Sequence, residues 1–587
     1  MKIKHYFGLA VIAAMTVSCS SNDELVNGGN GSGVNESGAS YASITINLPT
    51  ASGTRAANDV FAEGTAKEYA VNDATLLIFE KDGSSENAYK FVEKASLGNL
   101  EPWKKNNTNG ITTEATITAE LKNAKVGNTD YYALVILNNK DKNDAEKVTL
   151  PTGTTTYGAW NVATNTTETK LVDNTKGFYM ANAPEFKAAD QEPTTLVAIK
   201  NIYRTKEEAQ SKAATTVHVE RGLAKVTVES NSTSNYFATT GANATGANYS
   251  SDNVKITNWA LDVTNNSSFP VHVTAGLKDG VTSAGIPAYA DIWKNEATGT
   301  APATSRFVSQ LAATGAFKRV YWGIDPNYSM DLSDLTKCKA QFTLAEANGT
   351  GVTWNDGSGS DKPLYCLENT FDIKNMLQGQ TTRVLLKATY TPNALASATD
   401  KTFFMIGNSS DIWTMDNLKK QIESKAKDAL SITTGLTVEL MGDLLEGGTH
   451  FLTTTNVSIK DGTTEKVDAT LVATLNTKLG LDATNNVGIK TYKNGESYYI
   501  ARIKHFGDDL TPWNAGEAYS NDNLKYLGRY GVLRNNWYDL TIKSISGPGY
   551  PDVPEVKPNT PDDEDDKYIS VNVKILDWAK RSQSWDL

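Results

Sequence analysis

Hydrophobic and polar residues alternate along many short segments of the chain, and turn-forming residues separate these segments. In the first segment, "YASITINLP", the residues Ile44, Ile46 and Leu48 fall on one face of a pattern that repeats every two residues. Such a period predicts a half-buried β-strand. Further strands are predicted in "NDATLLIFEKDG", "TEATITAEL", "DYYALVILNN", "TTLVAIKNIYR", "TTVHVERGLAKVTVES", "NVKITNWALDVTNN", "TRVLLKATYT", "KTFFMIG", "ESYYIARIKHF" and "LRNNWYDLTIKSI".

The second half of the chain departs from this pattern in two places. In "MDNLKKQIESKAKDAL", Leu418, Ile422 and Leu430 recur at roughly helical spacing, which predicts an α-helix. Near the end, "SGPGYPDVPEVKPNTPDDEDD" combines prolines with an acidic run, which predicts a stiff, extended and solvated spacer. The last segment, "KYISVNVKILDWAKRSQSWDL", again alternates, so we expect a final strand that is held away from its domain.

Composition and charge narrow the function classes. A chain of 587 residues is too long for one compact domain, and its net charge of −11 argues against binding to nucleic acid. Abundant Thr, Asn, Gly and aromatic residues favour strands and turns. The chain is therefore predicted to be a secreted all-β protein, with a domain boundary close to "TTVHVERGLAKVTVES".

The segment "MKIKHYFGLAVIAAMTVSC" has the features of a cleaved export signal, with lysines before an apolar run that is too short to span a bilayer. Cys19 follows a small residue, as in bacterial lipoprotein signals, although Thr16 stands where such signals usually have Leu. An ordinary secretory signal is the alternative. We favour cleavage before Cys19, which would leave its thiol to carry diacylglycerol, with palmitate as an expected fatty acid of the lipid. Residues 20–40 form a Ser-, Gly- and Asn-rich tether.

A single arginine follows the first predicted strand. Arg55 lies in "PTASGTRAANDV" and is the only Lys or Arg between Lys4 and Lys67. Because its neighbours are small and lie in a loop, Arg55 could be a cleavage site for a trypsin-like protease. The simpler interpretation is that Arg55 is an ordinary solvated loop residue. Arg221 in "VERGLAK" lies within a strand pattern, so folding should protect it from cleavage.

Residues that could carry out catalysis show no recognisable arrangement. The histidines are scattered, no phosphate-binding loop or nucleophile elbow occurs, and "DDEDD" lacks the spacing of a calcium loop. Cys338 and Cys366 could form a disulfide in an oxidising compartment or be two buried thiols. No enzyme activity, metal site or cofactor is predicted.

Several motifs resemble one known family. They are "VERGLAKVTV" (219–228), "YWGIDPNY" (321–328), "YCLENTF" (365–371) and the C-terminal block in which "VLRNNWYDLTIKSI" precedes a Pro- and Asp-rich spacer and "SVNVKILDWAKRSQSWDL". With these motifs the sequence resembles the Bacteroidales fimbrillins, the structural subunits of protease-assembled type V pili. It is most similar to the major subunits of short fimbriae.

This resemblance implies a fold and a mode of assembly. Such subunits have two transthyretin-like β-sandwich domains and reach the outer membrane surface as lipoproteins. An arginine-specific or trypsin-like protease then removes the first strand, and the C-terminal strand of another copy fills the groove. The expected partners are therefore other copies, anchor and tip subunits, the outer membrane and the protease, and the polymer would support adhesion and biofilm formation.

Mapped onto this chain, the resemblance places cleavage between Arg55 and Ala56. The displaced strand would carry Ile44, Ile46 and Leu48. The donor strand would carry Val571, Val573, Ile575, Leu576 and Trp578. The expected divisions are a signal at 1–18, a propeptide at 19–55, β-sandwich domains at 56–215 and 216–548, a spacer at 549–569 and a donor strand at 570–587.

Two alternatives remain at this point. A glycan-binding surface lipoprotein would share the lipid anchor and β-sandwiches, and exposed aromatics such as Trp513 could stack on sugars. An anchor or tip pilin would keep its N-terminal segment or lack a free donor strand. Because the chain has both the Arg55 loop and a final strand, we favour a stalk subunit.

Overall fold

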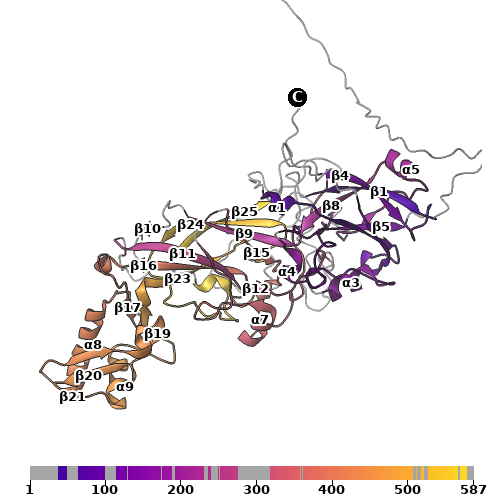
Figure 1. Cartoon of the computed structure of the whole chain (residues 1–587). Coiled ribbons are helices and arrows are strands. Elements are labelled where there is room, and N and C mark those ends of the chain that lie inside the picture. Colours follow the sequence, from indigo (N-terminus) through magenta and orange to yellow (C-terminus); the bar gives the residue numbers. More distant parts are fainter. Residues whose placement is uncertain are drawn as a thin grey trace, which may run out of the picture. The chain divides into compact units, whose positions relative to one another are not determined.

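The computed structural model describes residues 38–48, 64–98, 114–127, 130–164, 166–173, 175–187, 192–230, 236–238, 249, 251–274, 317–356, 359, 361–506, 511, 517, 519–520, 526–565 and 569–577. In this part of the chain, strands in several sheets predominate and the helices are mostly short (Figure 1). The all-β prediction is confirmed. None of the described helices is long and apolar enough to cross a membrane.

The first β unit is built on one sheet. Its strands follow the order β3 (Lys90–Ser96), β2 (Ala74–Glu80), β5 (Tyr131–Leu137), β6 (Met180–Asn182), β8 (Thr215–Arg221), β1 (Ser40–Asn47) and β4 (Glu114–Leu121), and β7 (Val197–Ala198) pairs with β5. Ala95 of β3 and Ile117 of β4 belong to one hydrophobic core, although these strands lie at opposite ends of the order. The sheet therefore curves around its core.

A second core covers the other face of this sheet. Leu77, Leu134 and Ile136 point into it, opposite to their neighbours along the same strands. The helices α3 (Tyr157–Ala163) and α4 (Glu168–Leu171) contribute Trp160 and Leu171. Both faces of β2 and β5 are therefore buried, which explains their nearly continuous apolar sequences.

The second β unit has two sheets. One follows the order β10 (Tyr236–Ala238), β11 (Asn253–Asp262), β16 (Arg383–Thr391) and β23 (Glu496–Arg502), with β14 (Asn355–Asp356) beside β11. The other follows the order β15 (Leu364–Leu367), β9 (Leu223–Ser230), β24 (Asn536–Ile545) and β25 (Ile569–Asp577). Val226, Trp259 and Tyr538 share the core to which both sheets contribute. The chain passes from β8 of the first unit to β9 of the second at Gly222.

Residues 403–492 add a unit with a core of its own. It contains two three-stranded sheets, with β17 (Phe403–Ile406), β22 (Ile489–Tyr492) and β19 (Gly448–His450) in one and β18 (Thr437–Leu440), β20 (Val457–Asp461) and β21 (Thr464–Glu465) in the other. The helices α8 (Met415–Leu430) and α9 (Ala469–Lys478) supply much of its core. The predicted helix at 415–430 is confirmed, and Leu418 and Ile422 are fully buried.

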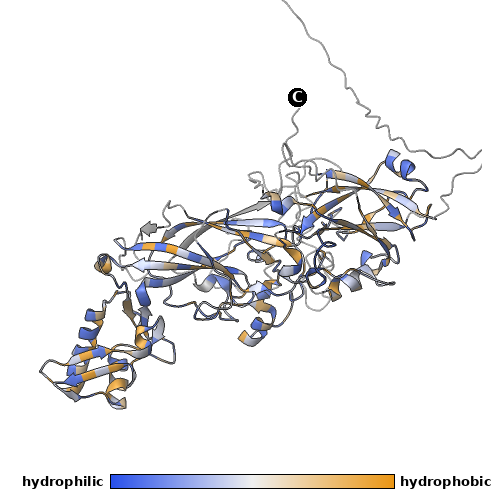
Figure 2. Cartoon of the chain, viewed as in Figure 1, coloured by the Kyte–Doolittle hydropathy of each residue, from blue (hydrophilic) through white to orange (hydrophobic). Residues whose placement is uncertain are grey.

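Shorter α-helices and strands are also present in the described part of the chain. They are α1 (Ala66–Tyr69), α5 (Lys206–Ser211), β12 (Thr264–Asn265), α7 (Leu335–Gln341) and β13 (Phe342–Thr343). Figure 2 shows hydrophobic and hydrophilic residues alternating along many strands, as the sequence pattern predicts. Cys338 and Cys366 are separate buried thiols and do not form a disulfide with each other. Burial raises the pKa of Cys338 to about 11.

Candidate assembly site

The first strand lies inside its sheet, between two partners. β1 pairs antiparallel with β4, with Ile44 opposite Ile117, and parallel with β8, with Ile46 opposite Val217. Ile44 and Ile46 are fully buried and Leu48 is 2% exposed. All three side chains lie in the core of the first β unit, as does Ala42, which the sequence analysis did not single out. The alternating period extends back to Ala42 and could have revealed it.

The opposite face of β1 is polar. The hydroxyl oxygens of Thr45 and Thr116 lie 2.8 Å apart, and those of Ser43 and Thr118 lie 3.0 Å apart. Ser43 also donates a hydrogen bond to the carbonyl oxygen of Ala209 in α5, at 2.8 Å. Side chains on this face of β1 therefore need to be small or polar, whereas those on the inner face need to be aliphatic.

The strand β4 depends on β1 for its place in the sheet. Among the described strands, β1 is the one strand with which β4 pairs, and the pairing runs from Ser40 opposite Leu121 to Asn47 opposite Glu114. Loss of β1 would expose the inner side chains of β4 and leave unpaired backbone groups on both β4 and β8. Such exposed edges readily accept another strand.

The predicted processing residues Cys19, Arg55 and Ala56 lie outside the described residues. The structure describes the chain up to Leu48 and again from Gly64, so Arg55 falls between β1 and α1. Arg221 is fully buried in β8, which confirms the expectation that folding protects it.

The helix that follows this gap is bound to the second β unit through Glu68. The Glu68 carboxylate forms an ion pair with Lys225 of β9 at 3.0 Å and accepts a hydrogen bond from the hydroxyl of Tyr365 of β15 at 2.6 Å. Arg221 donates to the backbone oxygen of Glu68 at 2.9 Å, and the Lys225 ammonium lies 3.6 Å from the ring centre of Trp537. β1 is thus held within the first sheet, whereas α1 is held mainly by Lys225 and Tyr365 of the second β unit and also by Arg221 of β8.

Burial and nearby charges shift the pKa of the Glu68 carboxyl group in opposite directions. Burial alone would raise the pKa of Glu68, but Lys225, the Tyr365 hydroxyl and Arg221 outweigh it and hold the pKa below its usual range. Glu68 therefore stays charged in the folded protein. The sequence pattern does not reveal this network, because its members are widely separated along the chain and lack a recognisable spacing.

The final strand of the described chain pairs with its own C-terminal sheet. β25 runs antiparallel to β24, with Val573 opposite Leu540 and Ile575 opposite Tyr538 (Figure 1). It stands at the edge of this sheet, with β24 as its partner among the described strands. Val571, Val573, Ile575 and Leu576 lie within the strand, and Trp578 lies outside the described residues.

The segment before this strand is not the solvated spacer that its composition predicts. Val553 and Val556 are 4% and 5% exposed, and the backbone oxygen of Pro554 accepts a hydrogen bond from Arg383 at 3.0 Å. Two carboxylates of the acidic run are also held by arginines: Asp562 contacts Arg502, and Asp563 lies 2.7 Å from Arg529. The prediction of a solvated spacer was wrong because arginines distant in sequence neutralise and anchor it.

A comparison with protein families identifies the C-terminal region. Residues 490–584 match the family described as "Major fimbrial subunit protein type IV, Fimbrillin, C-terminal". These residues therefore form a fimbrillin C-terminal region. The match spans β23, β24 and β25 and confirms the resemblance found in the sequence. The description of this family supports a fimbrial role at the cell surface.

Solved structures with some likeness to the chain include fimbrial proteins. One is a candidate cell adhesion protein from Parabacteroides distasonis ATCC 8503, which is 9% identical in sequence and has a TM-score of 0.37. The alignment covers 93% of the present chain and 99% of the adhesion protein. Another is the tip fimbrial protein Mfa3 from Porphyromonas gingivalis, which is 11% identical in sequence and has a TM-score of 0.29. The alignment covers 92% of the present chain and 100% of the Mfa3 chain. TM-scores of this size do not establish a shared fold. A comparison with curated proteins found no match.

Proposed function

We propose that this fimbrillin is the stalk subunit of a surface pilus that assembles by strand replacement. The precursor is exported as a lipoprotein that carries its lipid on Cys19 in the outer membrane. Cleavage after Arg55 separates the propeptide, residues 19–55, from the subunit. The C-terminal strand of another copy then takes the place of β1, and the polymer joins anchor and tip subunits and supports adhesion and biofilm formation.

The observation that carries this proposal is a repeat between the first and last strands. Residues 42–48 read "ASITINL" and residues 569–575 read "ISVNVKI". The aliphatic positions coincide, since Ile44, Ile46 and Leu48 correspond to Val571, Val573 and Ile575. The polar positions coincide as well, because Ser43 corresponds to Ser570 and Thr45 corresponds to Asn572. One residue before each segment, Tyr41 corresponds to Tyr568, which lies outside the described residues. The donor strand thus has the side chains that both faces of the groove require.

Once β1 is gone, the number of available partner strands favours its replacement by β25 of another copy. At the edge of its own sheet, β25 pairs with β24, whereas the position of β1 offers both β4 and β8. Each aliphatic side chain that fills the core contributes about 1.5–3 kcal/mol. Leu576 and Trp578 extend past the position of Leu48 and would lengthen the contact.

Arg55 is suited to the cleavage because it lies between the two anchored segments. It is the one basic residue within 49–63, so a cut there separates β1 from α1 while Glu68 keeps α1 in place. Five arginines of the described chain are protected by burial: Arg221, Arg383, Arg502, Arg529 and Arg534.

Limited proteolysis of the purified precursor tests this function. We expect an arginine-specific protease to cut after Arg55 and to produce a ladder of multimers on a non-boiled gel. The Arg55→Ala variant should remain uncut at this position, keep β1 and stay monomeric under the same conditions. A precursor that is cut cleanly after Arg55, loses β1 and remains monomeric at high concentration would contradict the proposal.

A further inference from the structure

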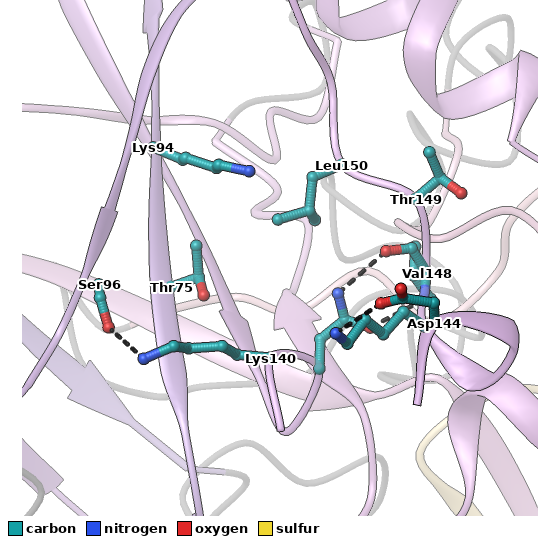
Figure 3. Close-up of a pocket in the computed structure, with 10 residues that line it drawn as sticks. Thr75, Lys94, Ser96, Lys140, Asp144, Val148, Thr149 and Leu150 are labelled. Carbon is teal, nitrogen blue, oxygen red and sulfur yellow. Dashed lines mark hydrogen bonds and ion pairs between the residues drawn. The ribbon is translucent and has the colours of Figure 1, made fainter. Parts of the chain in front are cut away.

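The first β unit contains a pocket with an excess of positive charge. Its volume is about 590 Å³, within the range of sites that bind small molecules (Figure 3). One wall is the sheet, where Thr75 of β2 lies opposite Ser96 of β3 and Lys94 projects from β3 on the same side as Ser96. The other wall is the segment 139–150, which contributes the remaining lining residues.

The second wall is held in place by buried and partly buried hydrogen bonds. The Asn139 side chain donates to the backbone oxygen of Val148 at 3.0 Å and accepts from its backbone N–H at 2.8 Å. The Asp73 carboxylate accepts from the backbone N–H groups of Asn139 and Lys140, at 3.0 and 2.9 Å. Trp160 donates to the backbone oxygen of Thr149 at 2.7 Å. The pocket is therefore formed before any ligand arrives.

Three ammonium groups and one carboxylate line this pocket. Lys147 is paired with Asp144 at 2.9 Å, and Lys140 donates to the neutral hydroxyl of Ser96 at 3.2 Å. Lys94 has neither an ion-pair nor a hydrogen-bond partner within the described chain, and in Figure 3 its side chain extends toward Leu150 across the pocket. The local charge is thus positive in a chain whose net charge is −11, so the pocket selects anions.

The rest of the lining indicates what kind of anion fits. Thr75, Ser96 and Thr149 offer hydroxyl groups, while Val148 and Leu150 offer an apolar surface. We propose that this pocket binds a carboxylate-bearing sugar unit of an acidic saccharide. Lys94 and Lys140 would contact the carboxylate, the hydroxyls would contact the ring hydroxyls, and the apolar side chains would contact the C–H groups of the ring.

Calorimetric titration of the uncleaved full chain tests this proposal with two acidic probes, trigalacturonate and sialyllactose. They represent the two sources of such a unit, uronate polysaccharides and sialylated glycans. The matched uncharged probes are methyl-esterified trigalacturonate and lactose. We expect at least one acidic probe to bind about tenfold or more tightly than its uncharged counterpart, with an affinity that falls as salt rises. If neither acidic probe binds at low ionic strength, the proposal is wrong.

Variants assign the binding to the pocket. Lys94→Glu with Lys140→Glu should weaken binding at least about tenfold, because two attractive contacts become repulsive. Lys420→Glu with Lys478→Glu makes the same change in net charge on exposed positions of α8 and α9, and should leave binding within about twofold. Ser96→Trp fills the pocket without reversing a charge and should also abolish binding. Equal weakening by both lysine pairs, or full binding by Ser96→Trp, would overturn the assignment.

Discussion

Cleaved subunits that carry Val573→Asp are expected to remain monomeric. Val573 corresponds to Ile46, which is fully buried between Val217 of β8 and Ala115 of β4. A carboxylate at this position would be buried without a partner, which costs about 3–5 kcal/mol and reduces multimer formation about a hundredfold or more. The measurement is the multimer ladder on a non-boiled gel after cleavage.

Asn572→Asp is the matched control for this variant. It introduces the same charge one residue away, at the position of Thr45 on the polar face of β1. This variant should polymerise like the parent chain, since that face accepts polar groups. Equal polymerisation by the two variants would show that the donor strand does not occupy the groove in the proposed register.

Glu68→Gln is expected to lower the free energy of unfolding by about 3–5 kcal/mol, because it leaves the Lys225 ammonium buried without its counter-charge. Lys225 and Glu68 side chains are 1% and 0% exposed, so solvent cannot replace the missing interaction. Urea denaturation measures the change. The double variant Glu68→Gln with Lys225→Met should recover part of the loss, and a single variant within about 1 kcal/mol of the parent would contradict the account.

The same carboxylate gives a pH dependence with a definite sign. Its pKa in the folded protein lies below that in the unfolded chain. Its contribution to stability is therefore fully present above the unfolded-state pKa, near 4.3, and is lost as the pH falls through the lower folded-state pKa. Urea midpoints of the parent chain should fall over this acidic range more steeply than those of Glu68→Gln.

The periodicity of hydrophobic residues predicted several strands and the longest helix of the described chain correctly. The two-residue period identified β1, β4 and β24, and helical spacing identified α8 with its buried Leu418 and Ile422. These signals succeed because one face of each element is buried and the other is not. The assignment of Ile44, Ile46 and Leu48 to an inner face rested on the same reasoning, and the structure places all three in the core.

Features that depend on contacts between distant residues could not be predicted. Asp562 belongs to an acidic, proline-rich segment, and its burial depends on Arg502, which lies in another strand. The position of β1 between β4 and β8 likewise follows from sheet order, which alternation does not reveal. The separate core of residues 403–492 depends on how its two helices pack against two small sheets.

The proposed register can be measured directly with one pair of cysteines. Thr45 and Thr116 are opposite each other in β1 and β4, so Asn572 of a donor strand should lie opposite Thr116 of the next subunit. After cleavage at Arg55, subunits with Thr116→Cys and Asn572→Cys should form a disulfide-linked ladder under oxidation, whereas Thr116→Cys with Lys574→Cys should not. Multimers that form without this cross-link, or that form it only in the shifted pair, would contradict strand replacement in this register.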